Sequence, residues 1–374
     1  MLSLTLIVVG AVVVQRYLRR VERSPGDPAD KMHRMRVWGL AEVFVSFIVL
    51  LAGNFEVNAE AAATGLGRST RIGGLVVLAV AWLVAMMAVT VTVARGYQRL
   101  RGTQERPSRL VRRALRMYAA MMLLPLTWWV LYPLVVRRHA GPAPMVVLAL
   151  GLLVVSAVVG PYVVMLMVRS RRPDEPTRRR LLAICRRHGV RLRDVRIIDT
   201  GADRTANALS TGVLPGLRYI FVTDRLLTDF ADDELEAVLA HEIGHARQHH
   251  LLVKLGLVVV ATGGVVGLLV LTASLLPDAR PVRLIAAVLL PLAMLAALLA
   301  AQGGAGLVLE RRADDYAART AGVDATRRAL EKLAAINLVK HRTGRLWNLL
   351  QQHPGMAQRI ERVRRAGHGH PAVT

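Results

Sequence analysis

Seven apolar runs constrain the fold of this chain more than any other feature of its sequence. A helix crosses the hydrocarbon core of a bilayer with about 20 apolar residues, and most of these runs reach or approach that length. With 53% hydrophobic residues, the chain is also more apolar than an ordinary soluble domain. We therefore predict a mainly α-helical, polytopic membrane protein with seven transmembrane helices. The runs are Met1–Val14, Val37–Gly53, Ile72–Ala94, Met117–Val136, Met145–Val168, Leu251–Leu276 and Leu284–Val308.

The charged residues predict how these helices are oriented. Lys and Arg number 50 against 26 Asp and Glu, which gives a formal net charge of +24. Arginines crowd the connection 95–116, whereas the connection 54–70 is poor in arginine. The positive-inside rule places the first connection in the cytoplasm and the second outside. The N-terminus is then outside, and the polar segments after the fifth and seventh runs are cytoplasmic.

The basic charge raises nucleic-acid binding as an alternative. We do not expect it, because the basic residues flank apolar runs instead of lying among exposed aromatic side chains. No charged side chain precedes the first run, which therefore predicts a span rather than a secretory signal peptide. The expected location is the cell membrane, with the bilayer as partner; the sequence indicates no particular oligomeric state. Glu42 in the second run is a candidate functional carboxylate, or one that merely reaches a polar interior or the interface.

A short motif in the polar segment 169–250 points to a chemical function. It is His-Glu-Ile-Gly-His, with His241, Glu242 and His245 in an H-E-x-x-H pattern. On a helix, positions i and i+4 share a face, so both imidazoles can point at one metal ion. Zinc lowers the pKa of a bound water toward neutral, and Glu242 can take the proton of that water. Such a motif arises by chance in roughly 1–2% of chains of this composition, so further ligands are needed to support it.

The chain offers a third ligand where it returns from the seventh run. Glu310 and Asp314 are four residues apart and share a helix face. A catalytic zinc site takes three protein ligands and keeps one position open. We interpret Glu310 as the third ligand and Asp314 as an acceptor that orients a histidine. The alternative is a solvated acidic patch beside Arg311 and Arg312. One Zn²⁺ per chain is the predicted cofactor.

These motifs resemble the HtpX and type-1 CAAX prenyl endopeptidase family of integral-membrane zinc metallopeptidases. The resemblance rests on the segment 233–245 around the H-E-x-x-H and on the E-x-x-A-D-x-x-A pattern that begins at Glu310, and it covers about residues 178–362. It implies a gluzincin-type peptidase domain, with helices and a small sheet, split by the last transmembrane hairpin. Five spans before the zinc motif resemble the CAAX arrangement. The predicted parts are a five-span membrane domain 1–168, a first peptidase segment 169–250, a hairpin 251–309 and a second peptidase segment with the tail 310–374.

The resemblance also suggests roles for residues outside the zinc motif. His353 would stabilise the oxyanion of the reaction, and Arg359 would hold the acidic groups in place. His353 precedes Pro354, so a residue that simply starts a helix is the alternative. Asn207 and Ala208 would open an edge strand that pairs with the extended substrate backbone.

The predicted function is a membrane-embedded zinc metalloendopeptidase that acts on membrane-bound or membrane-adjacent protein substrates. Glu242 would activate the water on the zinc. Two departures from the family pattern leave the substrate open. Leu307 stands where the family usually has an arginine, and the first five spans carry no family motif. The alternatives are a metalloprotease-type signalling receptor or regulator and a non-enzymatic membrane scaffold.

Overall fold

The chain is mostly helical and forms two compact units. The structure, a computed structural model, describes residues 2–65, 67–138, 143–275 and 280–367; the end of the predicted tail lies outside these ranges. The first unit comprises 1–118 with two short inserts from later in the chain, 201–204 and 338–340. The second unit comprises the remainder, including the whole segment that carries the zinc motif.

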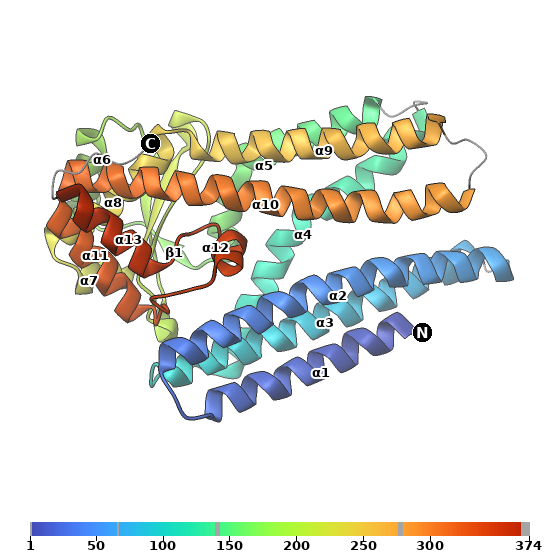
Figure 1. Ribbon diagram of the computed structural model, residues 1–374, viewed down its shortest axis with the longest axis horizontal. Coiled ribbons are helices and arrows are strands. Elements are labelled where there is room, and N and C mark those ends of the chain that lie inside the picture. Colours follow the sequence, from blue (N-terminus) through green and yellow to red (C-terminus); the bar gives the residue numbers. More distant parts are fainter. Residues whose placement is uncertain (1, 66, 139–142, 276–279, 368–374) are drawn as a thin grey trace. The chain divides into compact units, whose positions relative to one another are not determined.

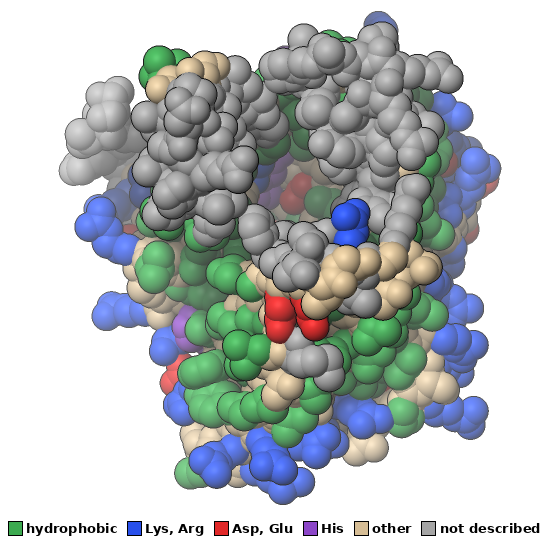
Figure 2. All heavy atoms as spheres, turned by 90° about the vertical axis from the view of Figure 1, so that its right-hand side faces the viewer, with side chains coloured by type: hydrophobic (Ala, Val, Ile, Leu, Met, Phe, Trp, Pro, Cys, Tyr) green, Lys and Arg blue, Asp and Glu red, His purple; other side chains and the backbone are tan. Residues whose placement is uncertain are grey.

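Three long helices make up most of the first unit, α1 (Leu2–Arg23), α2 (Pro28–Thr64) and α3 (Arg68–Leu100), and α4 (Pro107–Arg138) begins in it. Figure 1 shows α1, α2 and α3 side by side, and each packs on the other two. Apolar side chains fill the space between them. In the lower part of Figure 2, where these helices end, hydrophobic side chains dominate and Lys and Arg gather at the outer edge.

Glu42 lies inside this helical bundle. Its side chain is buried, and Gly10 of α1 passes so close that a Cβ there would lie 3.5 Å from Oε1 of Glu42. One turn further along α2, Ser46 accepts a hydrogen bond of 3.1 Å from Nε1 of Trp82. Glu42 therefore faces the interior of the bundle and does not reach the interface.

A four-stranded sheet forms the centre of the second unit. Its order is β1 (Ser170–Arg171), β2 (Asp194–Ile198), β4 (Tyr219–Thr223) and β3 (Ala208–Thr211). Strands β2 and β4 are parallel, whereas β1 and β3 pair antiparallel with their neighbours. Strand β3 therefore lies at an edge of the sheet. The β-branched and aromatic residues of β4 are buried throughout, as expected for a central strand.

Helices surround this sheet and extend from it. They are α5 (Ala143–Met167), α6 (Glu175–Arg187), α7 (Asp224–Asp229), α8 (Asp232–Arg247), α9 (His250–Leu275), α10 (Arg280–Ala321), α11 (Val323–Ile336), α12 (Arg345–Gln351) and α13 (Met356–Gly367), with short 3₁₀ turns at Gly201–Asp203 and Pro215–Leu217. Figure 1 shows α9 and α10 running side by side as a long hairpin. Helix α8 packs on β3, α10 and α11, so it lies between the sheet and the C-terminal helices.

As far as the structure describes them, the seven apolar runs form helices, but the helices do not stop where the runs do. Helix α2 continues beyond its run to Thr64, and α10 continues through Glu310 to Ala321 without a break at the predicted boundary of 309/310. Within the described ranges, two helices are long and apolar enough to cross a membrane, Leu2–Arg23 and Ser69–Leu100. The other five predicted spans are not confirmed by this criterion.

Candidate active site

Helix α8 presents the zinc motif to a cavity. Three acidic residues in its first turn favour the helix through its dipole. Ala231 is the N-cap, so the helix begins at Asp232; Glu234 reaches back and accepts a 3.0 Å hydrogen bond from the backbone N–H of Ala231. One face of α8 is buried in the core beside the sheet. On the opposite face, His241, Glu242 and His245 are partly buried and line the cavity.

A glycine lets α10 approach this helix closely. A Cβ on Gly244 would lie 3.2 Å from Cα of Ala313 and 3.3 Å from Cβ of Tyr316, which is tighter than most side-chain contacts. The small residues at this crossing bring Glu310, one turn before Ala313, beside the two histidines. Glu310 is almost fully buried.

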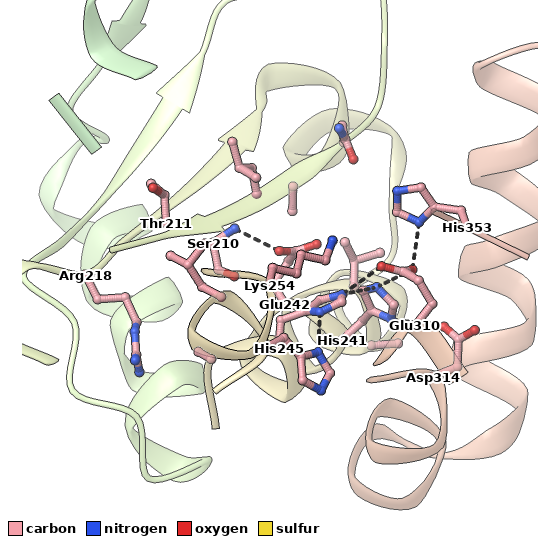
Figure 3. A pocket seen from close by; sticks show the side chains of 18 of the residues that line it. Ser210, Thr211, Arg218, His241, Glu242, His245, Lys254, Glu310, Asp314 and His353 are labelled. Carbon is pink, nitrogen blue, oxygen red and sulfur yellow. Dashed lines mark hydrogen bonds and ion pairs between the residues drawn. The ribbon is translucent and has the colours of Figure 1, made fainter. Parts of the chain in front are cut away.

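The three predicted ligands converge on one point. Nε2 of His245 lies 3.2 Å from Nε2 of His241 and 3.2 Å from Oε1 of Glu310. Nε2 of His241 lies 3.5 Å from Oε2 of Glu310, and one donor atom from each residue falls within 4.8 Å of the others. Figure 3 shows the two imidazoles and the carboxylate facing each other.

Asp314 and Arg359 form a charged pair behind His241. Oδ1 of Asp314 lies 3.0 Å from Nδ1 of His241, and Arg359 of α13 donates to both oxygens of Asp314 at 2.7 and 2.9 Å. Burial raises the pKa of the Asp314 carboxyl, but the charge of Arg359 and the hydrogen bonds from His241 and Arg359 together outweigh burial and hold that pKa well below its usual range. Burial likewise lowers the pKa of His241, yet Asp314 and Glu310 raise it to about 10. In the metal-free protein, His241 therefore carries a proton.

The carboxylate of Glu242 contacts the edge strand. Oε2 of Glu242 accepts a 2.8 Å hydrogen bond from the backbone N–H of Ser210 in β3 (Figure 3). This contact holds the carboxylate next to the strand and beside the three ligands. It was not predicted, because the sequence does not reveal which backbone groups of a strand point away from the sheet.

At the start of β3, the backbone groups of Asn207 and Ala208 point to opposite sides of the strand. The backbone N–H of Thr223 donates to the carbonyl of Asn207 at 3.0 Å, so Asn207 pairs toward β4. Because neighbouring residues of an antiparallel strand alternate in direction, the N–H and C=O of Ala208 point to the free edge, as the N–H of Ser210 does. The backbone of Ala208 is thus placed to pair with an added strand, whereas Asn207 can offer only its side chain.

His353 approaches the cluster from the turn after α12. Its Nδ1 lies 2.9 Å from Oε2 of Glu310, and its side chain is 55% exposed. Helix α12 lies directly on α10, since a Cβ on Gly303 would clash with the carbonyl oxygen of Leu349, and one on Gly306 would lie 2.6 Å from Cβ of Gln352. These two glycines allow the close approach that places His353 at the site.

All these groups line one cavity of about 520 Å³. Its wall includes the free edge of β3, the motif face of α8, the start of α9 and the turn with His353. A cavity of this volume is typical of sites that bind a small ligand or a short piece of chain. Apolar side chains from β3, α9 and α11 form much of the remaining wall.

One residue beside the ligands was missed by the sequence analysis. His250, the first residue of α9, is buried, and its Nδ1 lies 2.6 Å from Nδ1 of His245. The available signal was a further histidine five residues after His245, at the point where the polar helix gives way to an apolar run.

The donor set fits a zinc ion. Two imidazole nitrogens and one carboxylate oxygen are ligands that zinc takes, with a fourth tetrahedral position left for water or substrate. Oε2 of Glu310 is buried and has no partner with hydrogen-bond geometry among the described residues, even though Nδ1 of His353 is near. A buried carboxylate oxygen is costly without such a partner, and a cation at the cluster would supply one.

Comparisons with known proteins identify the family of the chain and a protein of similar fold. The model of peptidase family M48 matches residues 173–366. A protease HtpX homolog of Aeropyrum pernix is 31% identical over 113 residues, a match that covers 29% of this chain and 34% of that protein, so the match spans about a third of the relative's length. The crystal structure of S. mikatae Ste24p has a similar fold, with a TM-score of 0.70, 14% identity, and coverage of 96% of this chain and 97% of that one.

Proposed function

Because the chain belongs to peptidase family M48, of the HtpX and CAAX-protease type, we propose that it is a membrane zinc endopeptidase whose ligands are His241, His245 and Glu310. The observation that carries this proposal is the convergence of their donor atoms within 4.8 Å, with Glu242 alongside. One ion per chain is expected. When bound, zinc supplies a Lewis acid and lowers the pKa of a water toward neutral.

Four further residues have roles in the proposed reaction. Glu242, held by the N–H of Ser210, takes a proton from the attacking water and passes it to the leaving amine nitrogen. His353, beside Glu310 at the mouth of the cavity, stabilises the negative charge that develops on the carbonyl oxygen. Arg359 holds Asp314, which in turn orients His241.

The substrate backbone would bind as an added strand at the free edge of β3. Ala208 offers its N–H and C=O there, and Asn207 offers its side chain. An extended segment in this position would lie beside Glu242, which is where the scissile bond must be. Protein or peptide chains at the membrane are therefore the expected substrates.

We propose that the site lies at a membrane, because apolar helices adjoin it. Helix α9 begins three residues after α8 ends, so the zinc motif lies directly next to an apolar helix. We propose seven spans, an external N-terminus and a cytoplasmic site in the cell membrane, with the parts 1–168, 169–250, 251–309 and 310–374. The arginine-rich connection 95–116 supports this orientation.

The test is the variant Glu242→Gln, compared with Glu236→Gln on the same helix. Purified protein should bind about one zinc and digest casein; Glu242→Gln should keep the zinc and lose about 10²–10⁴-fold in rate. Glu236, which pairs with Arg187 away from the cavity, should tolerate the same change. Cleavage by Glu242→Gln would disprove its role as base, and zinc without any cleavage by the wild type would favour a scaffold.

A further inference from the structure

The second ring nitrogen of His245 faces another histidine and not a carboxylate. Its Nδ1 lies 2.6 Å from Nδ1 of His250, while its Nε2 faces Glu310 at 3.2 Å. The other histidine ligand differs, because Nδ1 of His241 faces the carboxylate of Asp314. The two ligands are thus oriented by groups of different charge.

His250 is itself the middle of a longer chain of contacts. Its Nε2 lies 3.1 Å from Oε1 of Gln248, and Nε2 of Gln248 donates to the backbone carbonyl of Arg312 at 3.3 Å. Arg312 follows Glu310 by two residues on α10. The chain of contacts therefore starts on the helix that carries one ligand and ends on another ligand, His245.

The backbone carbonyl of Arg312 determines which atoms carry the protons in this chain of contacts. A backbone carbonyl can only accept, so the amide nitrogen of Gln248 must face Arg312 and its amide oxygen must face His250. That oxygen also only accepts, so Nε2 of His250 carries a proton, which leaves Nδ1 of neutral His250 as an acceptor. Nδ1 of His245 must then be the donor, and Nε2 of His245 keeps its lone pair toward Glu310.

The backbone between the two helices makes this arrangement possible. Helix α8 ends at Arg247 and α9 begins at His250, and His249 adopts a φ of +53°, in the left-handed region. This tight turn brings His250 back against His245, where its side chain is only 2% exposed. A buried histidine without partners would be costly, but both ring nitrogens of His250 have one.

We infer that His250 is a positioning residue that, together with Gln248, holds His245 in the tautomer that can bind the metal. The inference rests on the proposed zinc site. A neutral acceptor orients the ring without adding another negative charge beside Glu310 and Asp314. Groups that orient metal-binding histidines in this way typically change metal affinity by about 10–100-fold when they are removed.

The experiment compares zinc affinities, measured by chelator competition, for three variants. His250→Leu removes the acceptor and should weaken zinc binding by about 10–100-fold. His250→Asn places an amide oxygen near the position of Nδ1 and should restore the affinity to within about threefold of wild type. Gln248→Leu should have a smaller effect of about three- to tenfold, because it acts only through His250.

The double variant Gln248→Leu/His250→Leu tests the order of this chain of contacts. If Gln248 acts through His250, the double variant should bind zinc no more weakly than His250→Leu alone.

The matched control is His341→Leu at an exposed histidine outside the cavity, which should leave the affinity unchanged. Thermal unfolding of the metal-free variants identifies any that fail to fold, and His250→Asn and Gln248→Leu remain informative in that case.

The outcomes separate this inference from the proposed function. Wild-type affinity in His250→Leu would overturn the inference, as would His250→Asn binding as weakly as His250→Leu, or effects of Gln248 and His250 that multiply. If the wild-type protein binds no zinc, the proposed function itself fails, before any variant is compared.

Discussion

Oδ1 of Asp314 lies 3.0 Å from Nδ1 of His241, and Arg359 donates a hydrogen bond to each oxygen of the same carboxylate. Both oxygens of Asp314 accept hydrogen bonds from Arg359. The amide of an asparagine at this position would have to place its NH₂ group against one of these donors. We expect Asp314→Asn to weaken zinc binding by about 10–100-fold while the fold is kept. Chelator competition measures the affinity.

A neighbouring pair provides the control for this prediction. Asp315 accepts two hydrogen bonds from Arg362 in the same bidentate manner, at 2.7 and 2.9 Å, but it does not line the cavity. Asp315→Asn should therefore leave zinc affinity unchanged. Equal losses in the two variants would mean that Asp314 acts through general stability and not through His241.

Zinc binding should depend steeply on pH. Burial lowers the pKa of His241, but Asp314 and Glu310 outweigh burial and raise the pKa to about 10. Below that pH, a proton occupies the nitrogen that zinc needs, so binding must release it. The apparent zinc affinity should rise about tenfold per pH unit between about pH 6.5 and 9.

Chelator competition at several pH values, corrected for protonation of the chelator, measures this slope. Asp314→Asn should flatten the slope, since it removes the largest favourable contribution to the raised pKa of His241. A wild-type affinity that is independent of pH would contradict the prediction.

The positions of the helices, and the grouping of three candidate metal ligands, follow from the sequence for physical reasons. Apolar runs must be buried in protein or lipid, and the seven form helices as far as the structure describes them. The expected edge strand at Asn207 and Ala208 corresponds to β3, which begins at Ala208 and lies at an edge of the sheet. Helix periodicity puts His241 and His245 on one face of α8, and Glu310 with Asp314 on one face of α10.

What the sequence did not predict depends on contacts between distant segments. The two-residue strand β1 has no pattern of its own and exists through pairing with β2. A helix was expected at Glu310 and Asp314, but hydropathy does not show that it continues the apolar helix without a break to Ala321. The contacts of Glu242 with Ser210 and of His245 with His250 arise from the register of β3 and from the turn after α8.

The approach of α12 to α10 predicts an effect on catalysis at a distance from the chemistry. A Cβ on Gly306 would lie 2.6 Å from Cβ of Gln352, the residue before His353. Gly306→Ala should displace this turn and lower kcat by about 10-fold or more, with zinc content unchanged, because a shift of about 1 Å in a catalytic group is costly. His353→Ala should lower kcat by about 10²–10³-fold, also with zinc retained.

Gly304 is the matched control on the same helix. A Cβ there meets nothing within 4 Å, so Gly304→Ala should leave kcat unchanged. Steady-state kinetics on a peptide substrate, with zinc content measured in parallel, distinguishes the three variants. Loss of zinc in Gly306→Ala would show that the glycine supports the ligand cluster and not the turn.

The proposed orientation predicts opposite labelling on the two sides of α3. Thr70 and Ser108 are exposed, and they lie in the arginine-poor and arginine-rich connections respectively. Cys185, the only native cysteine, is 1% exposed, and burial raises the pKa of its thiol to about 12, so it should react very slowly. A cysteine introduced at either position therefore reports its own side of the membrane.

A membrane-impermeant maleimide should label Thr70→Cys in intact cells, because the connection 54–70 is expected outside. It should label Ser108→Cys only after the cells are opened, because arginine-rich connections stay in the cytoplasm. The reverse pattern would invert the orientation and move the zinc motif to the outer face. Labelling of both positions in intact cells would mean that α3 does not separate the two compartments, and the seven-span arrangement would have to be abandoned.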